Sequence, residues 1–173
     1  MSPVVHLELS WLCAQPLARR RDRILVSVAG VLPDLDGLTL LGGLDAYGRW
    51  HHRLTHGYPA AIATGVLCAV LSEDRVRTTL LGLYTFHLHL FCDLLGSGPG
   101  WPLWYFWPTS QIEWFWAGQW DLGSWQNALI GMVATALCLA GALWWRRTVV
   151  EVVSLRADAA VVRALRARFH ASG

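Results

Sequence analysis

NALIGMVATALCLAGALWW, residues 127–145, is a run of nineteen residues without a charged side chain, and Arg146 and Arg147 follow it. About 20 apolar residues cross the hydrocarbon core of a bilayer as a helix. Of the 173 residues in the chain, 54% are hydrophobic and 15% are charged, whereas about 25% of residues are charged in an ordinary soluble domain. The sequence therefore predicts an all-α membrane protein.

Four further apolar stretches precede this one, and together they predict a polytopic helical bundle. They are residues 3–18, 24–44, 57–71 and 78–95. The second is interrupted at Pro33, and a break at membrane depth is tolerated only where the freed backbone faces protein or a wet cavity. We therefore expect four to five hydrophobic helices, one of them broken at Pro33, in a single membrane domain of residues 1–147. Residues 148–173 mix aliphatic and charged side chains, which predicts a cytoplasmic amphipathic helix.

Arginine placement predicts the orientation in the membrane. The chain has no lysine, so its fourteen basic residues are all arginines. If the five stretches alternate in direction, twelve arginines fall on one side and only Arg49 and Arg53 on the other, and such an excess marks the cytoplasmic side. The protein is then multi-pass with a cytoplasmic C-terminus. Because the basic residues serve orientation and the net charge is only +2, we expect membrane lipids and no nucleic acid as partners.

Several ionisable residues lie inside or beside the apolar stretches, where a charge costs roughly 2.5 kcal/mol or more. A helix rises about 1.5 Å per residue, so depth can be counted from the cytoplasmic arginines. His6, Asp34 and His89 then lie roughly 20, 17 and 18 Å above that side. Asp93 lies about 6 Å higher than His89, and His56 lies at roughly 28 Å. These polar groups converge on the outer half of the membrane, which predicts a functional site there.

The spacing of these residues is typical of metal ligands. His52 and His56 are four residues apart, as are His89 and Asp93, and on a helix this spacing places two side chains on one face. Imidazole with carboxylate suits zinc first, with manganese or iron as alternatives, whereas calcium or magnesium takes an oxygen cage. The candidate ligands are His6, Asp34, Asp36, His52, His56, His89 and Asp93. They suffice for two ions, or for one ion and a carboxylate base.

Residues near these pairs receive other interpretations. His51 and His87 are out of phase with the paired ligands, so we expect them outside the site. Arg53 is expected to hold an anionic substrate oxygen beside the metal, because a guanidinium matches phosphate and carboxylate. The Trp-rich residues 101–125 are either interfacial anchors or a lid over the site.

The order of the motifs resembles the LexA-binding, inner-membrane-associated family of predicted metal-dependent hydrolases. The motifs are an early histidine, Leu-Pro-Asp-Leu-Asp at 32–36, His-Arg-x-x-His at 52–56, His-x-x-x-Asp at 89–93 and a Trp-Pro stretch, and they cover about residues 4–108. Carried over residue by residue, the family motif falls on His6, Asp34, Asp36, His52, Arg53, His56, His89 and Asp93. The family usually has glycine and serine where this chain has Leu54 and Gly57. The resemblance implies a bacterial inner-membrane hydrolase, and the family's distant similarity to zinc-dependent phospholipases C implies phosphoester substrates.

The sequence thus predicts a membrane-embedded metal-dependent hydrolase with a lipid or other phosphoester substrate. The metal would activate a water, Asp34 or Asp36 would orient or deprotonate that water, and Arg53 would hold the substrate's anionic group. The alternatives are a membrane protein that binds or transports a metal, and an adaptor that binds a cytoplasmic regulator through its tail. A transporter needs polar residues that continue to the cytoplasmic face, and residues 127–145 show no such path, which favours the enzyme. Substrate identity and oligomeric state have no signature in the sequence.

Overall fold

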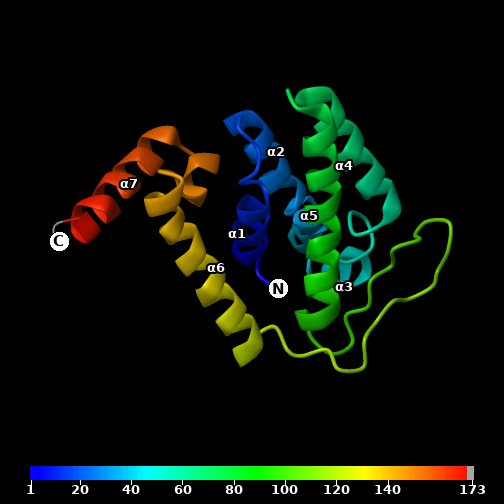
Figure 1. Cartoon of the computed structure of the whole chain (residues 1–173). Coiled ribbons are helices and arrows are strands. Elements are labelled where there is room, and N and C mark those ends of the chain that lie inside the picture. The colour runs from blue at the N-terminus through cyan, green and yellow to red at the C-terminus, as the bar shows by residue number, and fades with distance from the viewer. Residues whose placement is uncertain (171–173) are drawn as a thin grey trace.

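The computed structural model describes residues 1–170, which form helices joined by turns and one long loop (Figure 1). No β-strand occurs in this part of the chain, so the expectation of an all-α fold is confirmed. The α-helices and the 3-10 helices, labelled η, are α1 (Pro3–Cys13), α2 (Arg20–Ala29), η1 (Leu32–Gly42), α3 (Leu44–Trp50), α4 (Tyr58–Leu71), α5 (Arg75–Gly96), α6 (Trp125–Trp144), η2 (Val149–Val152) and α7 (Leu155–His170).

The long helix α5 is the centre of the bundle. It packs against α4 and α2, and α1 contacts both α2 and α6 (Figure 1). Small residues let helices approach closely: a Cβ atom at Gly82 of α5 would lie 2.6 Å from Cys68 Sγ of α4. Further along α5, Phe86 is fully buried in a cluster with Ala61 of α4 and Leu103 of the following loop. These contacts fix the turn of α5 that carries the polar residues.

Residues 24–44 contain a broken helix, as expected. α2 ends at Ala29, η1 begins at Leu32, and the two helices are bent by 51°. The break comes just before Pro33, because proline has no amide hydrogen to donate and disfavours helical geometry in the residue before it. The carbonyl oxygen of Gly30 at the break accepts a hydrogen bond from a side chain of α5.

By length and apolar composition, α6 is the one helix in residues 1–170 that could cross a membrane by itself, and α2 with η1 would form a second, bent span. α4 is apolar but has only 14 residues, and α1 has 11, whereas a span takes about 20. α5 has 22 residues, but its polar residues lower its hydropathy. The structure therefore supports one span, or two with the bent pair, and four to five spans stay a prediction.

The arginine-bearing starts of α2 and α5 meet at one end of the molecule. The Asp22 carboxylate of α2 accepts the backbone N–H groups of Glu73 and Asp74, at 2.9 and 3.0 Å, just before α5 begins. Arg19 pairs with Glu73 at 3.2 Å. The N-terminus, the end of α5 and the start of α6 lie at the opposite end (Figure 1). This arrangement agrees with the predicted alternation of helix directions.

The 3-10 helix η2 attaches the C-terminal segment to the bundle. Glu151 of η2 is buried and accepts hydrogen bonds from the Trp11 indole at 3.0 Å and from the Arg23 guanidinium at 2.7 Å. Asp158 of α7 accepts from the backbone N–H and the hydroxyl of Thr148, at 2.7 and 2.6 Å. The predicted domain boundary between residues 147 and 148 is therefore followed directly by η2, which contacts α1 and α2 of the bundle.

Candidate metal centre

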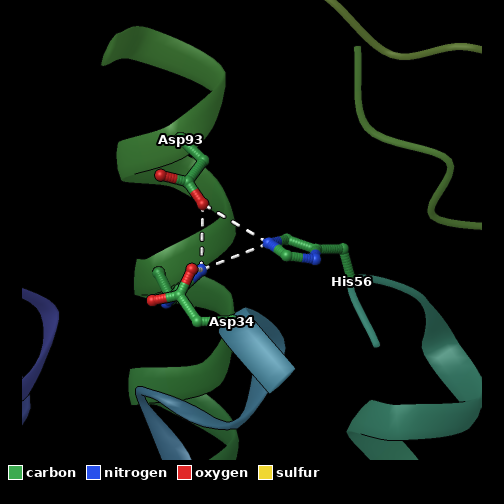
Figure 2. A group of neighbouring side chains, drawn as sticks. Asp34, His56 and Asp93 are labelled. Carbon is green, nitrogen blue, oxygen red and sulfur yellow. Dashed lines mark hydrogen bonds and ion pairs between the residues drawn. The ribbon is translucent and has the colours of Figure 1, made fainter. Parts of the chain in front are cut away.

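Three segments that are far apart in the sequence bring four predicted ligands together. Asp34 comes from η1, His56 from the turn before α4, and Asp93 from α5, one turn after His89. Figure 2 shows Asp34, His56 and Asp93 pointing toward one another. His56, His89 and Asp93 are buried, and the Asp34 side chain is 16% exposed. The convergence predicted from helix depth is present in the fold.

The separations of the four side chains fit a single tetrahedral ion. One ligand atom from each lies within 4.8 Å of the others. His89 Nε2 is 3.3 Å from His56 Nε2. The same atom is 2.9 Å from Asp93 Oδ2 and 3.7 Å from Asp34 Oδ1. Zinc bonds of about 2.0–2.2 Å at tetrahedral angles place ligand atoms about 3.3 Å apart, so the donor types and their spacing suit zinc.

Hydrogen bonds fix which ring nitrogens face the centre. His89 Nδ1 lies 2.8 Å from the carbonyl oxygen of Gly30, and His56 Nδ1 lies 2.9 Å from Asp36 Oδ2. A carbonyl and a carboxylate only accept, so both Nδ1 atoms carry hydrogen and a neutral ring presents its Nε2 lone pair to the centre. With both rings neutral, two lone pairs would face each other at 3.3 Å, so this arrangement favours a proton or a metal ion at that point. A cation between them removes the repulsion, and an acceptor behind each histidine is typical of metal sites.

The centre combines negative charge with unpaired polar atoms. Asp93 Oδ2, Asp34 Oδ2 and His52 Nδ1 are buried without a hydrogen-bond partner, although buried polar atoms are normally paired. Burial lowers the pKa of His56, but the carboxylates of Asp36 and Asp93 outweigh it and raise the pKa to about 9. The surroundings therefore favour a positive charge at this point, which a divalent cation supplies as it displaces the proton.

His6 and His52 flank these ligands. His6 Nε2 lies 3.2 Å from Asp93 Oδ1, and the His6 ring stacks on His89 with centroids 3.7 Å apart. His52 Nε2 lies 3.8 Å from Asp93 Oδ2. The backbone of His52 has φ 64°, a left-handed conformation that is uncommon for residues other than glycine and that clusters at functional sites. Both histidines are buried and contact the Asp93 carboxylate, so they belong to the same centre.

Asp36 lies behind His56 and connects it to a residue that the sequence pattern missed. Asp36 Oδ1 is 2.7 Å from His51 Nδ1, and Oδ2 is 2.9 Å from His56 Nδ1. The Thr55 amide also donates to Oδ2 at 3.3 Å. Asp36, His51 and His56 are close enough to hold a cation of their own, so the geometry is compatible with one ion or with two. The expectation that His51 lies outside the site was wrong.

The expectation that His52 and His56 share one face of a helix was also wrong. Residues 51–57 form turns between α3 and α4. The Thr55 hydroxyl donates to the carbonyl oxygen of Pro33, and its amide donates to a carboxylate of η1. Such side-chain and backbone contacts replace the hydrogen bonds of a helix, and they aim the two histidines at the centre by another route.

The pair on α5 follows the prediction. His89 and Asp93 lie one turn apart on a continuous helix, with His89 Nε2 2.9 Å from Asp93 Oδ2. His87 is exposed, and its ring contacts the carbonyl oxygen of Leu83 at 2.8 Å and the hydroxyl of Tyr105 at 3.0 Å. His87 therefore lies outside the centre, as the helical phase indicated.

A cavity of about 600 Å³ opens beside the centre, a volume in the range of small-molecule sites. Its lining includes Asp34, His51, His52 and Asp93 on a polar side and Leu40, Tyr47, Trp101 and Leu122 on a more apolar side. Arg53 does not line this cavity. Its guanidinium carbon lies 3.7 Å from the ring centroid of Trp104, in an adjoining pocket.

The fold and the site define a helical membrane protein with a buried histidine and carboxylate centre of metal-ligand type. The family model described as YdjM inner membrane protein matches residues 1–165, and the chain belongs to this family. It is accordingly an inner-membrane protein. No curated protein and no solved structure matches the chain. The inner-membrane part of the resemblance is thus confirmed, and LexA binding and hydrolysis stay predictions.

Proposed function

We propose that this protein is a membrane-embedded metal-dependent hydrolase that acts on a lipid or another phosphoester. The observation that carries the proposal is the convergence of Asp34, His56, His89 and Asp93 beside a cavity of about 600 Å³, whose wall includes Asp34 and Asp93. A structural zinc site is closed, whereas a catalytic one keeps a position open to water or substrate. A centre that borders a cavity is suited to the second role.

Three of these residues would hold the ion, and the fourth would act on the water. The ligand atoms of His56, His89 and Asp93 lie between 2.9 and 3.5 Å apart. Asp34 is farther away, at 3.7 Å from His89, and it lines the cavity. Three protein ligands with an open fourth position are typical of catalytic zinc. Zinc, or manganese or iron in its place, would lower the pKa of a bound water and polarise the scissile bond.

The roles of the other polar residues follow from their partners. Asp34 would take the proton of the water, because it is the partly exposed carboxylate that lies beside the ligands and lines the cavity. His51 donates its Nδ1–H to Asp36 and lines the cavity, so its Nε2 is placed to exchange a proton with the leaving group. Asp36 is buried and already accepts three hydrogen bonds, which suits it to orient both imidazoles rather than to act as a base.

Packing below the centre favours an enzyme over a transporter. Val26 and Ala29 of α2 and Phe86 of α5 are fully buried on the arginine-bearing side of the ligands. A transported cation would need polar groups through this layer. The hydroxyls of Ser27 and Thr85, which are also buried there, already donate to backbone carbonyl oxygens, those of Arg23 at 2.7 Å and of Val26 at 3.1 Å.

The test is hydrolysis of a panel of lipid and soluble phosphoesters by detergent-purified protein, before and after chelation and reloading with zinc, manganese or iron. We expect an activity that disappears on chelation and returns with one of the metals. Asp34→Asn should keep its metal and lose about 10²–10⁴-fold in kcat, the usual contribution of a general base. Glu113→Gln, an exposed acid in the loop before α6, is the matched control. Turnover that survives chelation, or no turnover with any metal, would contradict the proposal.

A further inference from the structure

A second pocket adjoins the metal cavity and has the opposite charge. It has a volume of about 330 Å³, and its lining contains Arg49 and Arg53 but, among the described residues, no carboxylate. The metal cavity contains Asp34 and Asp93 and no arginine. Two of its residues, His51 and Trp101, line both spaces. A molecule that fills both would therefore pass beside His51 and Trp101.

Arg53 is held in this pocket without an anionic partner. Its guanidinium carbon lies 3.7 Å from the ring centroid of Trp104, a stacking contact that fixes the plane of the group. Its Nε atom is buried and has no hydrogen-bond partner. Within residues 1–170, neither Arg53 nor Arg49 forms an ion pair. A buried donor that belongs to a charged group costs free energy when it has no hydrogen-bond partner. This pocket is therefore suited to an anion from outside the chain.

We propose that the pocket of Arg49 and Arg53 binds a second anionic group of the substrate, a phosphate or carboxylate, while the scissile phosphoester lies in the metal cavity. This inference rests on the proposed function and narrows the substrate class to phosphoesters that carry another anion. A guanidinium fork matches the oxygens of phosphate or carboxylate with two parallel hydrogen bonds. In this arrangement Arg53 binds the far part of the substrate and not the reacting phosphoester, so Arg53 sets substrate specificity.

The first arm of the test measures binding of inorganic phosphate to chelated protein, so that no metal can hold the anion. We expect wild type to bind phosphate, and Arg49→Gln and Arg53→Gln to bind it at least about tenfold more weakly, because each loses a charge-assisted hydrogen bond. Arg49 is exposed, so its variant should fold. Arg77→Gln is the matched control, since Arg77 is exposed and pairs with Asp74 at the start of α5. Equal binding by all four proteins, or none by wild type, would overturn the subsite.

The second arm compares two lipids that share the same scissile phosphoester, one of which ends in an additional phosphate. We expect wild type to favour the doubly anionic lipid by about 10–100-fold in kcat/KM, through KM. Arg49→Gln should remove this preference, whereas Arg77→Gln, the control of the first arm, should keep it. A preference that survives Arg49→Gln would overturn the inference. Because phosphate binding in the first arm needs neither metal nor hydrolysis, failure of the hydrolase proposal and failure of the anion subsite give different results.

Discussion

Two buried clusters of charged residues lie at opposite ends of the bundle, and their bonding differs. At the arginine-bearing end, Arg23 donates to both carboxylate oxygens of Glu151 at 2.7 Å. Its remaining nitrogen donates to the carbonyl oxygens of Leu17 and Ala18, at 3.1 and 2.8 Å. The Trp11 indole N–H also donates to the Glu151 carboxylate at 3.0 Å. One positive and one negative group are matched there, and their bonds lie inside the protein.

The histidine and carboxylate centre has no such balance. Its carboxylates, those of Asp34, Asp36 and Asp93, outnumber its one fixed positive group, the Met1 ammonium 2.6 Å from Asp93 Oδ1. Asp93 Oδ2 and Asp34 Oδ2 have no hydrogen-bond partner, and the Nε2 atoms of His56 and His89 face each other at 3.3 Å. Desolvated charge is tolerated in a fold when it is paired. The Arg23 cluster is therefore complete as a structural contact, whereas the histidine and carboxylate centre needs a metal cation to satisfy its remaining ligand atoms.

The largest expected effect is on metal content. Detergent-purified wild type should carry a transition metal in near-stoichiometric amount, and Asp93→Asn and His89→Gln should carry almost none, because each removes a ligand. His87→Gln is the matched control, since His87 lies on the same helix but is exposed and outside the centre. Elemental analysis of the four proteins makes the measurement. Equal metal content in all four proteins, or no metal in wild type, would contradict the claim that the histidine and carboxylate centre binds a metal ion.

The complementary change breaks the completed cluster. Glu151→Gln should lower the free energy of unfolding by about 3–5 kcal/mol, because it leaves the buried Arg23 guanidinium without its counter-charge, and metal content should not change. Glu73→Gln is the control: Glu73 pairs with Arg19, but the two side chains are 51% and 69% exposed, and such pairs contribute about 0–1 kcal/mol. Unfolding of the chelated proteins in detergent measures the stability of the two variants, and elemental analysis before chelation measures their metal content. Loss of metal in Glu151→Gln would show that the clusters are not independent.

An intermediate effect is expected at Asp36, which contacts His56 from behind. Asp36→Asn should keep the metal stoichiometry but weaken the metal Kd by about 10–100-fold, the usual effect of removing a partner that orients a ligand. Titration of the chelated protein with zinc against a competing chelator measures the Kd. A complete loss of metal, equal to that of Asp93→Asn, would mean that Asp36 is itself a ligand and would favour two ions.

The sequence predicted the convergence of the site better than its local structure. Counting residues from the arginines brought His6, Asp34 and His89 to one depth, and in the fold His6 stacks on His89 at 3.7 Å while Asp34 Oδ1 lies 3.7 Å from His89 Nε2. Residues at equal distances along helices from the same side of the membrane lie at one depth because every helix has the same rise per residue. The four-residue spacing of His52 and His56 was misleading, because tertiary contacts of the turn override local periodicity.

The residues that the sequence did not reveal depend on contacts between segments. His51 meets Asp36 across fifteen positions of the chain, and no spacing rule relates a turn to a 3-10 helix. The placement of Arg53 likewise depends on Trp104 of the loop after α5. Long-range pairing of this kind follows from packing, whereas the apolar stretches and the break near Pro33 follow from composition and backbone chemistry.

The smallest expected effect is the pH dependence of the completed cluster. Burial raises the pKa of Glu151, but the hydrogen bonds from Arg23 and Trp11 outweigh it and hold the pKa below the ordinary value of 4.5. A carboxyl group whose pKa is lowered by folding contributes stability that is present above its unfolded pKa and lost as pH falls through the folded one. The stability gap between wild type and Glu151→Gln should therefore be constant at neutral pH and shrink below about pH 4.5. Melting temperatures of the two chelated proteins between about pH 7 and about pH 3 measure this gap. A gap that widens toward low pH would mean that Glu151 is protonated in the native fold.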